Sequence, residues 1–232
     1  MNLVIDIGNT RIKVAKYNEH EILQLDFYSS TDSLLEIINS YRYKNLIISN
    51  VGETSLDNLK GIDYLLFSNS TPIPIYNKYK SESLGVDRIA AAVGASELFP
   101  KQPLLVVDFG SAITIDFVNC KREYIGGNIS PGMLFRFKAL HNFSAHLPLV
   151  DFQGDIFLHA QTTQDAIRSG VCKGISFEIK QYIELYRKKY PKLKVIFSGG
   201  DANFFAKTLK KRIFVAENLV LDGLNTILKY NI

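Results

Sequence analysis

The sequence predicts an α/β protein made of two similar halves, each with a mixed sheet and flanking helices. Apolar stretches of strand length alternate with segments of helical spacing along the 232 residues, a pattern typical of this class. An apolar stretch that runs into Asp-x-Gly also occurs twice, at residues 4–8 and, 102 residues later, at 106–110. We therefore expect a duplicated fold with halves at 1–103 and 104–216, and a C-terminal helix of about 217–232 that packs back on the first half.

The first half begins with the pattern of an antiparallel meander, in which alternating apolar positions predict half-buried strands. Leucine and isoleucine side chains at helical spacing follow, and Ser33 with Glu36 predicts a capping box at the start of that helix. The expected elements are strands at 2–7, 11–17, 21–28 and 46–49, a turn at 8–10, helices at 31–41 and 87–98, and a loop at 68–83. This order of elements predicts a mixed sheet.

The second half repeats strand, turn and strand, and then becomes helical. Strands are expected at 104–109, 112–118 and 195–197, and helices at 162–190 and 219–229. Residues 126–132 have the composition of a glycine-rich loop that leads into a helix from Pro131, because proline suits the first turn of a helix. The long helix is expected to bend near Gly170 and Gly174.

Composition excludes several classes of protein. Hydrophobic residues make up 47% and charged residues 22%, which excludes a disordered, collagen-like or coiled-coil chain. The two cysteines, Cys120 and Cys172, form no CxxC pair, which excludes a disulfide scaffold and a cysteine-rich zinc site. Asp6 interrupts the first apolar stretch, and no stretch approaches the roughly 18 apolar residues of a membrane helix. We therefore expect a cytoplasmic protein with no membrane association.

The positive charge is concentrated in one stretch. Residues 185–215 hold nine of the 27 basic residues and a single acid, Asp201. A solvated helix end explains such a stretch, and attraction of an anionic nucleotide or of a nucleic acid explains it as well. The sequence shows neither an aromatic-basic RNA-binding motif nor a helix-turn-helix pattern, so nucleic acid is not the expected partner.

The first Asp-x-Gly turn has the chemistry of a phosphate-binding loop. Gly8 lets the backbone approach a bulky anion, because no Cβ intervenes. Asn9, Thr10 and the N–H groups of the turn can donate hydrogen bonds to phosphate oxygens, and Lys13 adds positive charge. Asp6 repels phosphate and so acts through a bound cation or its waters. A strand-ending Asx turn is the alternative for one copy, and the second copy favours phosphate binding.

The second turn offers the same groups. Asp108 can hold a cation, while Ser111 and the Gly110 amide can face phosphate. Asp116 is expected at a strand end with a structural hydrogen bond. Two such loops resemble the nucleotide clamp of the actin, hexokinase and Hsp70 superfamily. The resemblance implies duplicated RNase H-like domains, with mixed sheets, flanking helices and an ATP cleft between the two domains.

Further motifs resemble one family within that superfamily. Gly-Val-Asp-Arg stands at 85–88, a glycine-rich segment at 126–132, Thr-Gln-Asp-Ala-Ile-Arg-Ser-Gly at 163–170, and Ser-Gly-Gly-Asp-Ala at 198–202. In this order and spacing the set is similar to type III pantothenate kinases, over residues 3 to about 221. The resemblance implies ATP-dependent phosphorylation of the primary hydroxyl of pantothenate to 4'-phosphopantothenate, the first step of coenzyme A biosynthesis.

The same resemblance implies roles for individual residues. Asp87 is the implied catalytic base, although an aspartate there also suits a helix N-cap. Arg88 suits the substrate carboxylate, with a surface ion pair as the alternative. Asp108 is implied to bind potassium or ammonium, and Asp6 to bind magnesium through water. The residues implied to bind ATP are Asp6, Ile7, Gly8, Asn9, Thr10, Arg11, Ile12, Lys13, Ser111, Gly199 and Gly200.

The implied pantothenate site lies at the interface of a homodimer. Its implied residues are Tyr79, Gly85, Val86, Asp87, Arg88 and Thr163, the last reaching the partner subunit's substrate. Tyr76 is the second choice for the loop tyrosine, because the proline usual in that loop is missing. Ser111 stands where the family usually has threonine, and Thr162 where asparagine is common.

Other classes of enzyme find no support in the sequence. The four histidines, His20, His141, His146 and His159, show no zinc-binding spacing. The chain also has neither a Walker A motif nor a GxSxG elbow. Two alternatives share the expected fold: a non-catalytic transcriptional accessory factor, and a kinase of the superfamily that phosphorylates another acceptor.

Overall fold

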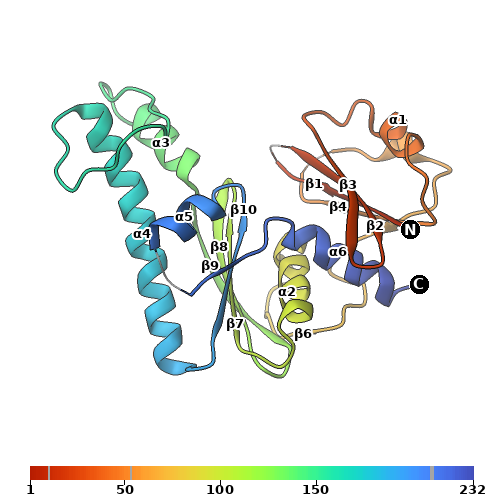
Figure 1. The fold of residues 1–232 in the computed structure, drawn as a ribbon. Coiled ribbons are helices and arrows are strands. Elements are labelled where there is room, and N and C mark those ends of the chain that lie inside the picture. Colours follow the sequence, from red (N-terminus) through yellow and green to blue (C-terminus); the bar gives the residue numbers. More distant parts are fainter. Residues whose placement is uncertain (10, 53, 210–211) are drawn as a thin grey trace. The chain divides into compact units, whose positions relative to one another are not determined.

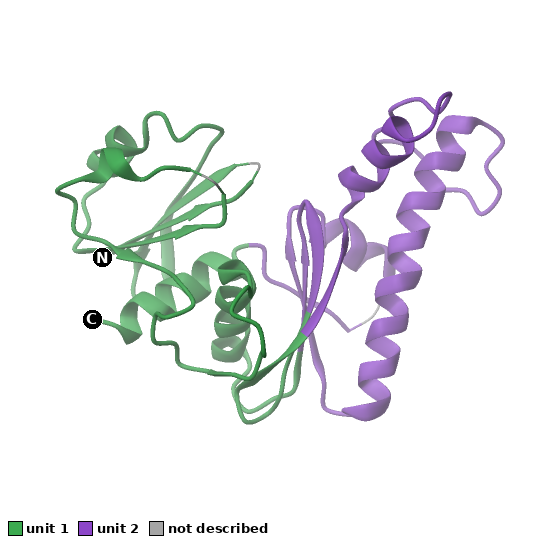
Figure 2. Ribbon diagram, turned by 180° about the vertical axis from the view of Figure 1, so that it is seen from behind, with its two compact units in different colours: residues 1–104, 116–126, 218–232 green, residues 105–115, 127–217 purple. Residues whose placement is uncertain are grey.

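A computed structural model describes residues 1–9, 11–52, 54–209 and 212–232. The chain forms two compact units (Figure 2). Unit 1 comprises Met1–Leu104, Asp116–Gly126 and Asn218–Ile232, and unit 2 comprises Leu105–Ile115 and Gly127–Glu217. Among the described residues, no helix combines the length and the apolar character needed to span a membrane.

Unit 1 contains a five-stranded sheet in the order β3-β2-β1-β4-β5 (Figure 1). Its strands are β1 (Asn2–Ile7), β2 (Ile12–Asn18), β3 (Glu21–Tyr28), β4 (Asn45–Asn50) and β5 (Leu65–Leu66). The central strand β1 is buried along its whole length, and it pairs antiparallel with β2 and parallel with β4. The antiparallel meander and the mixed sheet predicted from the sequence are therefore confirmed.

Helices cover this sheet because each presents an apolar face. They are α1 (Leu34–Asn39), η1 (Asp57–Leu59), α2 (Val86–Leu98) and α6 (Leu219–Tyr230). Leu34 and Ile38 of α1 pack on Leu3 and Ile5 of β1 in one apolar cluster. Helix α6 packs on α2 and also contacts β1 and β4. The last helix of the chain therefore belongs to the same unit as the first strand.

The second sheet has the order β11-β10-β7-β8-β9-β6. Its strands are β6 (Tyr76–Asn77), β7 (Leu104–Phe109), β8 (Ala112–Val118), β9 (Glu123–Pro131), β10 (Lys194–Gly199) and β11 (Phe214–Val215). The two sheets share one strand order when the edge strand β6 is left out and the strands of each half are numbered from one to five along the chain. Read from one edge, that order is 3-2-1-4-5 in both sheets. The repeat of residues 4–8 at 106–110 thus reflects a repeat of the fold, as predicted.

Unit 2 carries three helices: α3 (Met133–Asn142), α4 (Thr163–Lys189) and α5 (Ala202–Leu209). Helix α4 packs against α3 and α5. The Phe109 ring stacks on Phe205 of α5 at a centroid distance of 4.8 Å, and Phe197 of β10 meets it edge-on. These aromatic contacts fix β7 and β10 against α5, and both strands end at candidate site residues.

Several local predictions are wrong. Residues 126–131 continue strand β9, and α3 begins at Met133 after Pro131 and Gly132. Strand pairing satisfies the backbone there, and Gly126 adopts φ +134° within the strand. Helix α1 is shorter than 31–41, and Ser33 makes no side-chain capping bond within the described chain. The loop 68–83 includes strand β6.

Candidate active site

The turn between β1 and β2 brings Asp6 and Lys13 together. The two residues are paired across the strands, and the Gly8 N–H donates to the Arg11 carbonyl oxygen at 3.2 Å. Asn9 is exposed, and Thr10 lies outside the described residues. The Arg11 guanidinium carbon lies 5.2 Å from the centre of the Phe27 ring on β3. The predicted phosphate-binding loop thus connects two antiparallel strands. Ile7 and Ile12 on either side of it are buried.

Asp6 is a buried carboxylate at the end of β1. Among the described residues its Oδ1 atom has no hydrogen-bond partner, and neither do Ser49 Oγ and Asn50 Oδ1 at the end of β4. Burial raises the pKa of Asp6 to about 6; Lys13 acts against the rise and the charge of Asp87 adds to it. A buried carboxylate with an unpaired oxygen has the chemistry to bind a cation or the waters of a cation.

Asp87 is the second residue of α2, which begins at Val86 after Gly85. Its Oδ1 atom accepts a hydrogen bond from the Arg88 backbone N–H at 2.8 Å. The N-cap alternative for Asp87 is therefore wrong, and Gly85 holds the N-cap position. Burial raises the pKa of the Asp87 carboxyl, Arg88 opposes this rise, and Asp116 adds to it. A half-buried carboxylate with a raised pKa suits proton abstraction from an alcohol.

Arg88 forms a buried ion pair. Its Nη2 atom donates to Asp116 Oδ1 at 2.6 Å, and its Nε atom donates to the same oxygen at 3.1 Å. The Tyr124 hydroxyl also donates to Asp116 Oδ1 at 2.6 Å. The surface ion pair considered for Arg88 is thus replaced by a pair in the interior. Asp116 lies inside β8, not at its end as predicted.

Tyr79 lies beside this ion pair, whereas Tyr76 is on the edge strand. The Arg88 guanidinium carbon is 5.8 Å from the centre of the Tyr79 ring. Tyr79 also meets Tyr124 edge-on at 6.2 Å. A Cβ atom at Gly126 would be 3.5 Å from the Tyr79 ring, so the glycine backbone forms part of its surroundings. Tyr76 is 67% exposed.

Sequence reasoning did not identify Tyr124, Ser49 or Asn50 as residues of the candidate site. Asp116 carries a signal in the sequence, because a lone aspartate within the apolar segment 112–118 needs a buried partner. The partner itself, Arg88, is 28 residues away along the chain. Only the folded structure brings the two together.

Unit 2 contains the second predicted loop. Asp108 is near the end of β7, as Asp6 is near the end of β1. Gly199 ends β10 with φ +88°, and a Cβ atom there would collide with Asp108 Oδ1. Gly200 is exposed, and Ser111 is half-buried in the turn after β7. The structure thus brings Gly199 to Asp108, and the loop needs a glycine for both its conformation and its space.

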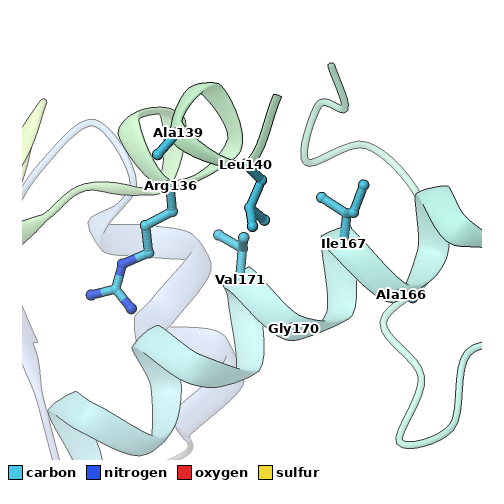
Figure 3. A pocket seen from close by; sticks show the side chains of 7 residues that line it. All are labelled: Arg136, Ala139, Leu140, Ala166, Ile167, Gly170 and Val171. Carbon is cyan, nitrogen blue, oxygen red and sulfur yellow. The ribbon is translucent and has the colours of Figure 1, made fainter. Parts of the chain in front are cut away.

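Thr163 is the exposed first residue of α4. Thr162 caps this helix: its Oγ1 atom accepts the Asp165 backbone N–H at 3.2 Å. Asp165 in turn pairs with Arg168 at 2.6 Å. A pocket of about 390 Å³ lies between α3 and the same end of α4 (Figure 3). It is lined by Arg136, Ala139, Leu140, Ala166, Ile167, Gly170 and Val171.

The duplicated sheets and the paired Asp-x-Gly turns define a two-domain, ATPase-like fold. A Thermus thermophilus ROK hexokinase shares this fold, with a TM-score of 0.52 and 11% identity over 99% of this chain and 98% of that chain. The family model of type III pantothenate kinase matches residues 2–185. The chain therefore belongs to the type III pantothenate kinase family.

Individual relatives are similar to this chain over nearly its whole length. A type III pantothenate kinase from Bacteroides fragilis is 44% identical over 100% of this chain and 98% of that protein. A solved structure from Campylobacter jejuni, assigned to the Baf family of transcriptional activators, is similar with a TM-score of 0.69. It is 26% identical and covers 99% of this chain and 98% of its own.

Proposed function

We propose that the protein transfers the γ-phosphoryl group of ATP to the primary hydroxyl of pantothenate, the first step of coenzyme A biosynthesis. Membership of the type III pantothenate kinase family supports this function. The observation that carries it is the pair Asp87–Arg88 at the start of α2. A carboxylate with a raised pKa stands next to a guanidinium group, so a base and an anion-binding group are adjacent.

In this mechanism Asp87 accepts the proton of the pantothenate hydroxyl as its oxygen attacks the γ-phosphorus. The raised pKa of Asp87 brings its basicity closer to that needed near neutral pH. Arg88 binds the substrate carboxylate by charge-assisted hydrogen bonds. Tyr79, Gly85 and Val86 line the pantothenate site, and the contact of Tyr79 with Arg88 supports Tyr79 over Tyr76.

The phosphates of ATP bind at the turn after β1. In this proposal Lys13 and N–H groups of the turn hold the phosphate oxygens. The unpaired Oδ1 atom of Asp6 fits a magnesium ion with its waters, because magnesium usually takes one or two carboxylates and keeps several waters. When bound, magnesium neutralises charge that develops on the transferred phosphoryl group.

We also propose ATP-binding roles for residues of unit 2. Ser111 contacts phosphate, and Gly199 and Gly200 allow the adenosine moiety to approach the backbone. Asp108 binds potassium or ammonium. An aspartate oxygen is a suitable donor for such a cation, and the close contact with Gly199 keeps side-chain bulk away from it.

The exposed apolar surface of unit 2 supports a homodimer as the active form. Large apolar side chains are exposed on α3, on α4 and in the segment between these two helices: Leu134, Phe135, Leu140, Phe143, Phe157, Leu158 and Phe177. Figure 3 shows Leu140 reaching from α3 toward Ile167 and Val171 of α4. A second copy of the chain is the partner that we propose for this surface, and we assign to the exposed Thr163 a contact with the partner subunit's pantothenate. We also propose that the enzyme works in the cytoplasm, where ATP is available.

A coupled assay of ADP release tests the function. With ATP, magnesium and potassium, ADP release should depend on added pantothenate. Asp87→Asn should lower kcat by about 10²–10⁴-fold, the usual contribution of a general base. Glu97→Gln on the same helix is the matched control. It makes the same kind of carboxylate-to-amide change, at an ion pair with Arg122 that is not part of the candidate site. Pantothenate-independent ADP release, or full activity of Asp87→Asn, would contradict the proposal.

A non-catalytic regulator is the second candidate. The similarity to the Campylobacter jejuni protein favours it. The basic side chains Arg187, Lys188 and Lys189 lie in the last turn of α4, where they also complement the helix dipole. Salt-sensitive DNA binding without phosphoryl transfer would support the regulator. Transfer to an acceptor other than pantothenate would indicate a different kinase of the superfamily.

A further inference from the structure

The buried side of the Arg88 guanidinium is held by two residues that have no role in the proposed chemistry. Arg88 is 6% exposed and Asp116 1% exposed, and Tyr124, which is bonded to Asp116, is fully buried. A buried charge needs a partner, so Asp116 compensates Arg88. Such a pair is also rigid, because two donors of one guanidinium meet one carboxylate.

We propose that Asp116, locked by Tyr124, is a positioning residue that fixes Arg88 for recognition of the substrate carboxylate. The proposal rests on the proposed function and adds a determinant of substrate specificity to it. Asp116 does not touch the substrate in this scheme. It acts through Arg88 alone.

The hydrogen bonds define which part of Arg88 is left for the substrate. A guanidinium group has five N–H donors. Asp116 takes the Nε donor and one Nη2 donor, at 3.1 and 2.6 Å from its Oδ1 atom. Asp116 leaves three donors unused, and the Tyr79 side chain lies beside the group. The carboxylate of pantothenate is the anion that these donors would meet.

Tyr124 prevents the Asp116 carboxylate from rotating. Its hydroxyl donates to the same Oδ1 atom that Arg88 uses, at 2.6 Å. Its ring also supports Tyr79 edge-on at 6.2 Å. Tyr124 therefore holds both the partner of Arg88 and the aromatic ring beside Arg88. Loss of the hydroxyl should loosen Arg88 without removing any charge.

Substrate specificity tests the proposal directly. Pantothenol has a hydroxymethyl group in place of the carboxylate, so it cannot form the ion pair with Arg88. The wild-type protein should prefer pantothenate over pantothenol in kcat/KM by about tenfold or more, the usual effect of a charge-assisted hydrogen bond. Asp116→Asn should reduce this preference to below about threefold by raising the KM for pantothenate. Its kcat/KM for pantothenol and its KM for ATP should stay within about twofold of the wild-type values.

Two further variants make the result decisive. Tyr124→Phe should reduce the preference partly, and it serves as the test variant if Asp116→Asn does not fold. Glu97→Gln makes the same carboxylate-to-amide change at the Arg122 ion pair and should keep the full preference. A folded Asp116→Asn or Tyr124→Phe protein with the wild-type preference would overturn the proposal.

Different results would contradict the kinase activity and the positioning role of Asp116. A wild-type protein that phosphorylates neither compound would refute the proposed function and this inference with it. A wild-type protein that phosphorylates both equally well would leave the kinase in place and would overturn the role of Arg88 and Asp116 in carboxylate recognition. Loss of pantothenol and pantothenate turnover together in Asp116→Asn would indicate a general structural role and would also overturn the inference.

Discussion

Gly223 of α6 lies in backbone contact with Ala90 of α2, so close that a Cβ atom on Gly223 would overlap the Ala90 carbonyl oxygen. The contact is reciprocal: a Cβ atom on Gly94 of α2 would be 2.5 Å from the Leu219 carbonyl oxygen of α6. Two glycines thus allow the two helices to approach each other closely. Helix α2 also carries Asp87 and Arg88 in its first turn, so this crossing positions the candidate catalytic residues.

Gly223→Ala should destabilise the protein strongly. The new methyl group meets backbone atoms, which cannot rotate away, so the two helices must separate. We expect a loss of about 3 kcal/mol in the free energy of unfolding, measured by urea denaturation. Gly174→Ala in α4 is the matched control, because its nearest described neighbour would be Arg136 Nη1 at 3.8 Å. That variant should gain about 0.5–1 kcal/mol, and equal stability of both variants would contradict the model of close packing.

Asp6→Asn should stabilise the protein while abolishing activity. The folded-state pKa of Asp6 is about 6 against an ordinary value of 3.8. The folded protein therefore holds the proton more tightly than the unfolded chain. Proton binding by Asp6 therefore stabilises the folded protein. This stabilisation is complete below pH 3.8 and is lost as the pH rises through 6. The difference corresponds to roughly 3 kcal/mol at pH 7.5.

The measurement is the unfolding free energy of wild type and Asp6→Asn at pH 4.5 and 7.5. The variant should gain stability at pH 7.5 and much less at pH 4.5. Phosphoryl transfer should be lost, because asparagine carries no charge for magnesium. An equal gain in unfolding free energy at both pH values would show that removal of the buried Asp6 charge does not cause the added stability.

Local sequence patterns were sufficient to predict the strands and helices that depend on hydrophobic periodicity. Residues 2–7 form a buried strand because every side chain there except Asn2 and Asp6 is apolar. Residues 126–131 were predicted wrongly, because their glycines and proline carry turn signals that strand pairing overrides. The repeated Asp-x-Gly segments predicted the repeated order of strands, since the same local pattern was present in both halves.

The candidate site was predictable only where one segment holds the whole feature. Asp6 and Lys13 face each other in one hairpin, and Asp87 lies next to Arg88 in one helical turn. The ion pair between Arg88 and Asp116 joins α2 to β8, and residues 116–126 group with unit 1. No local pattern identifies such a contact, because it depends on which strands and helices pack together.

The cation proposed at Asp108 should make the enzyme depend on the monovalent salt. The initial rate in potassium or ammonium chloride should exceed the rate in sodium chloride at equal ionic strength by at least about fivefold. Asp108→Asn should make the rates in these salts similar, because the charge that holds the cation is lost. Full activity of the wild-type protein in sodium alone would contradict a selective cation site.

Gly85→Ala should lower activity with little effect on stability. A Cβ atom on Gly85 would be 2.5 Å from Asp87 Oδ1, so the carboxylate must leave its position beside the Arg88 N–H group. The backbone of Gly85, at φ −58° and ψ 130°, suits alanine as well. We expect a change in unfolding free energy within about 1 kcal/mol.

The same variant should lower kcat by about 10²-fold, because a displacement of about 1 Å is enough to misplace a catalytic base. The KM for ATP should stay near its wild-type value, since the phosphate loop is untouched. Gly174→Ala, whose methyl group would make an ordinary contact with Arg136 at 3.8 Å, should retain the wild-type kcat. A normal kcat in folded Gly85→Ala would show that the observed position of the Asp87 carboxylate is not the one used in proton transfer.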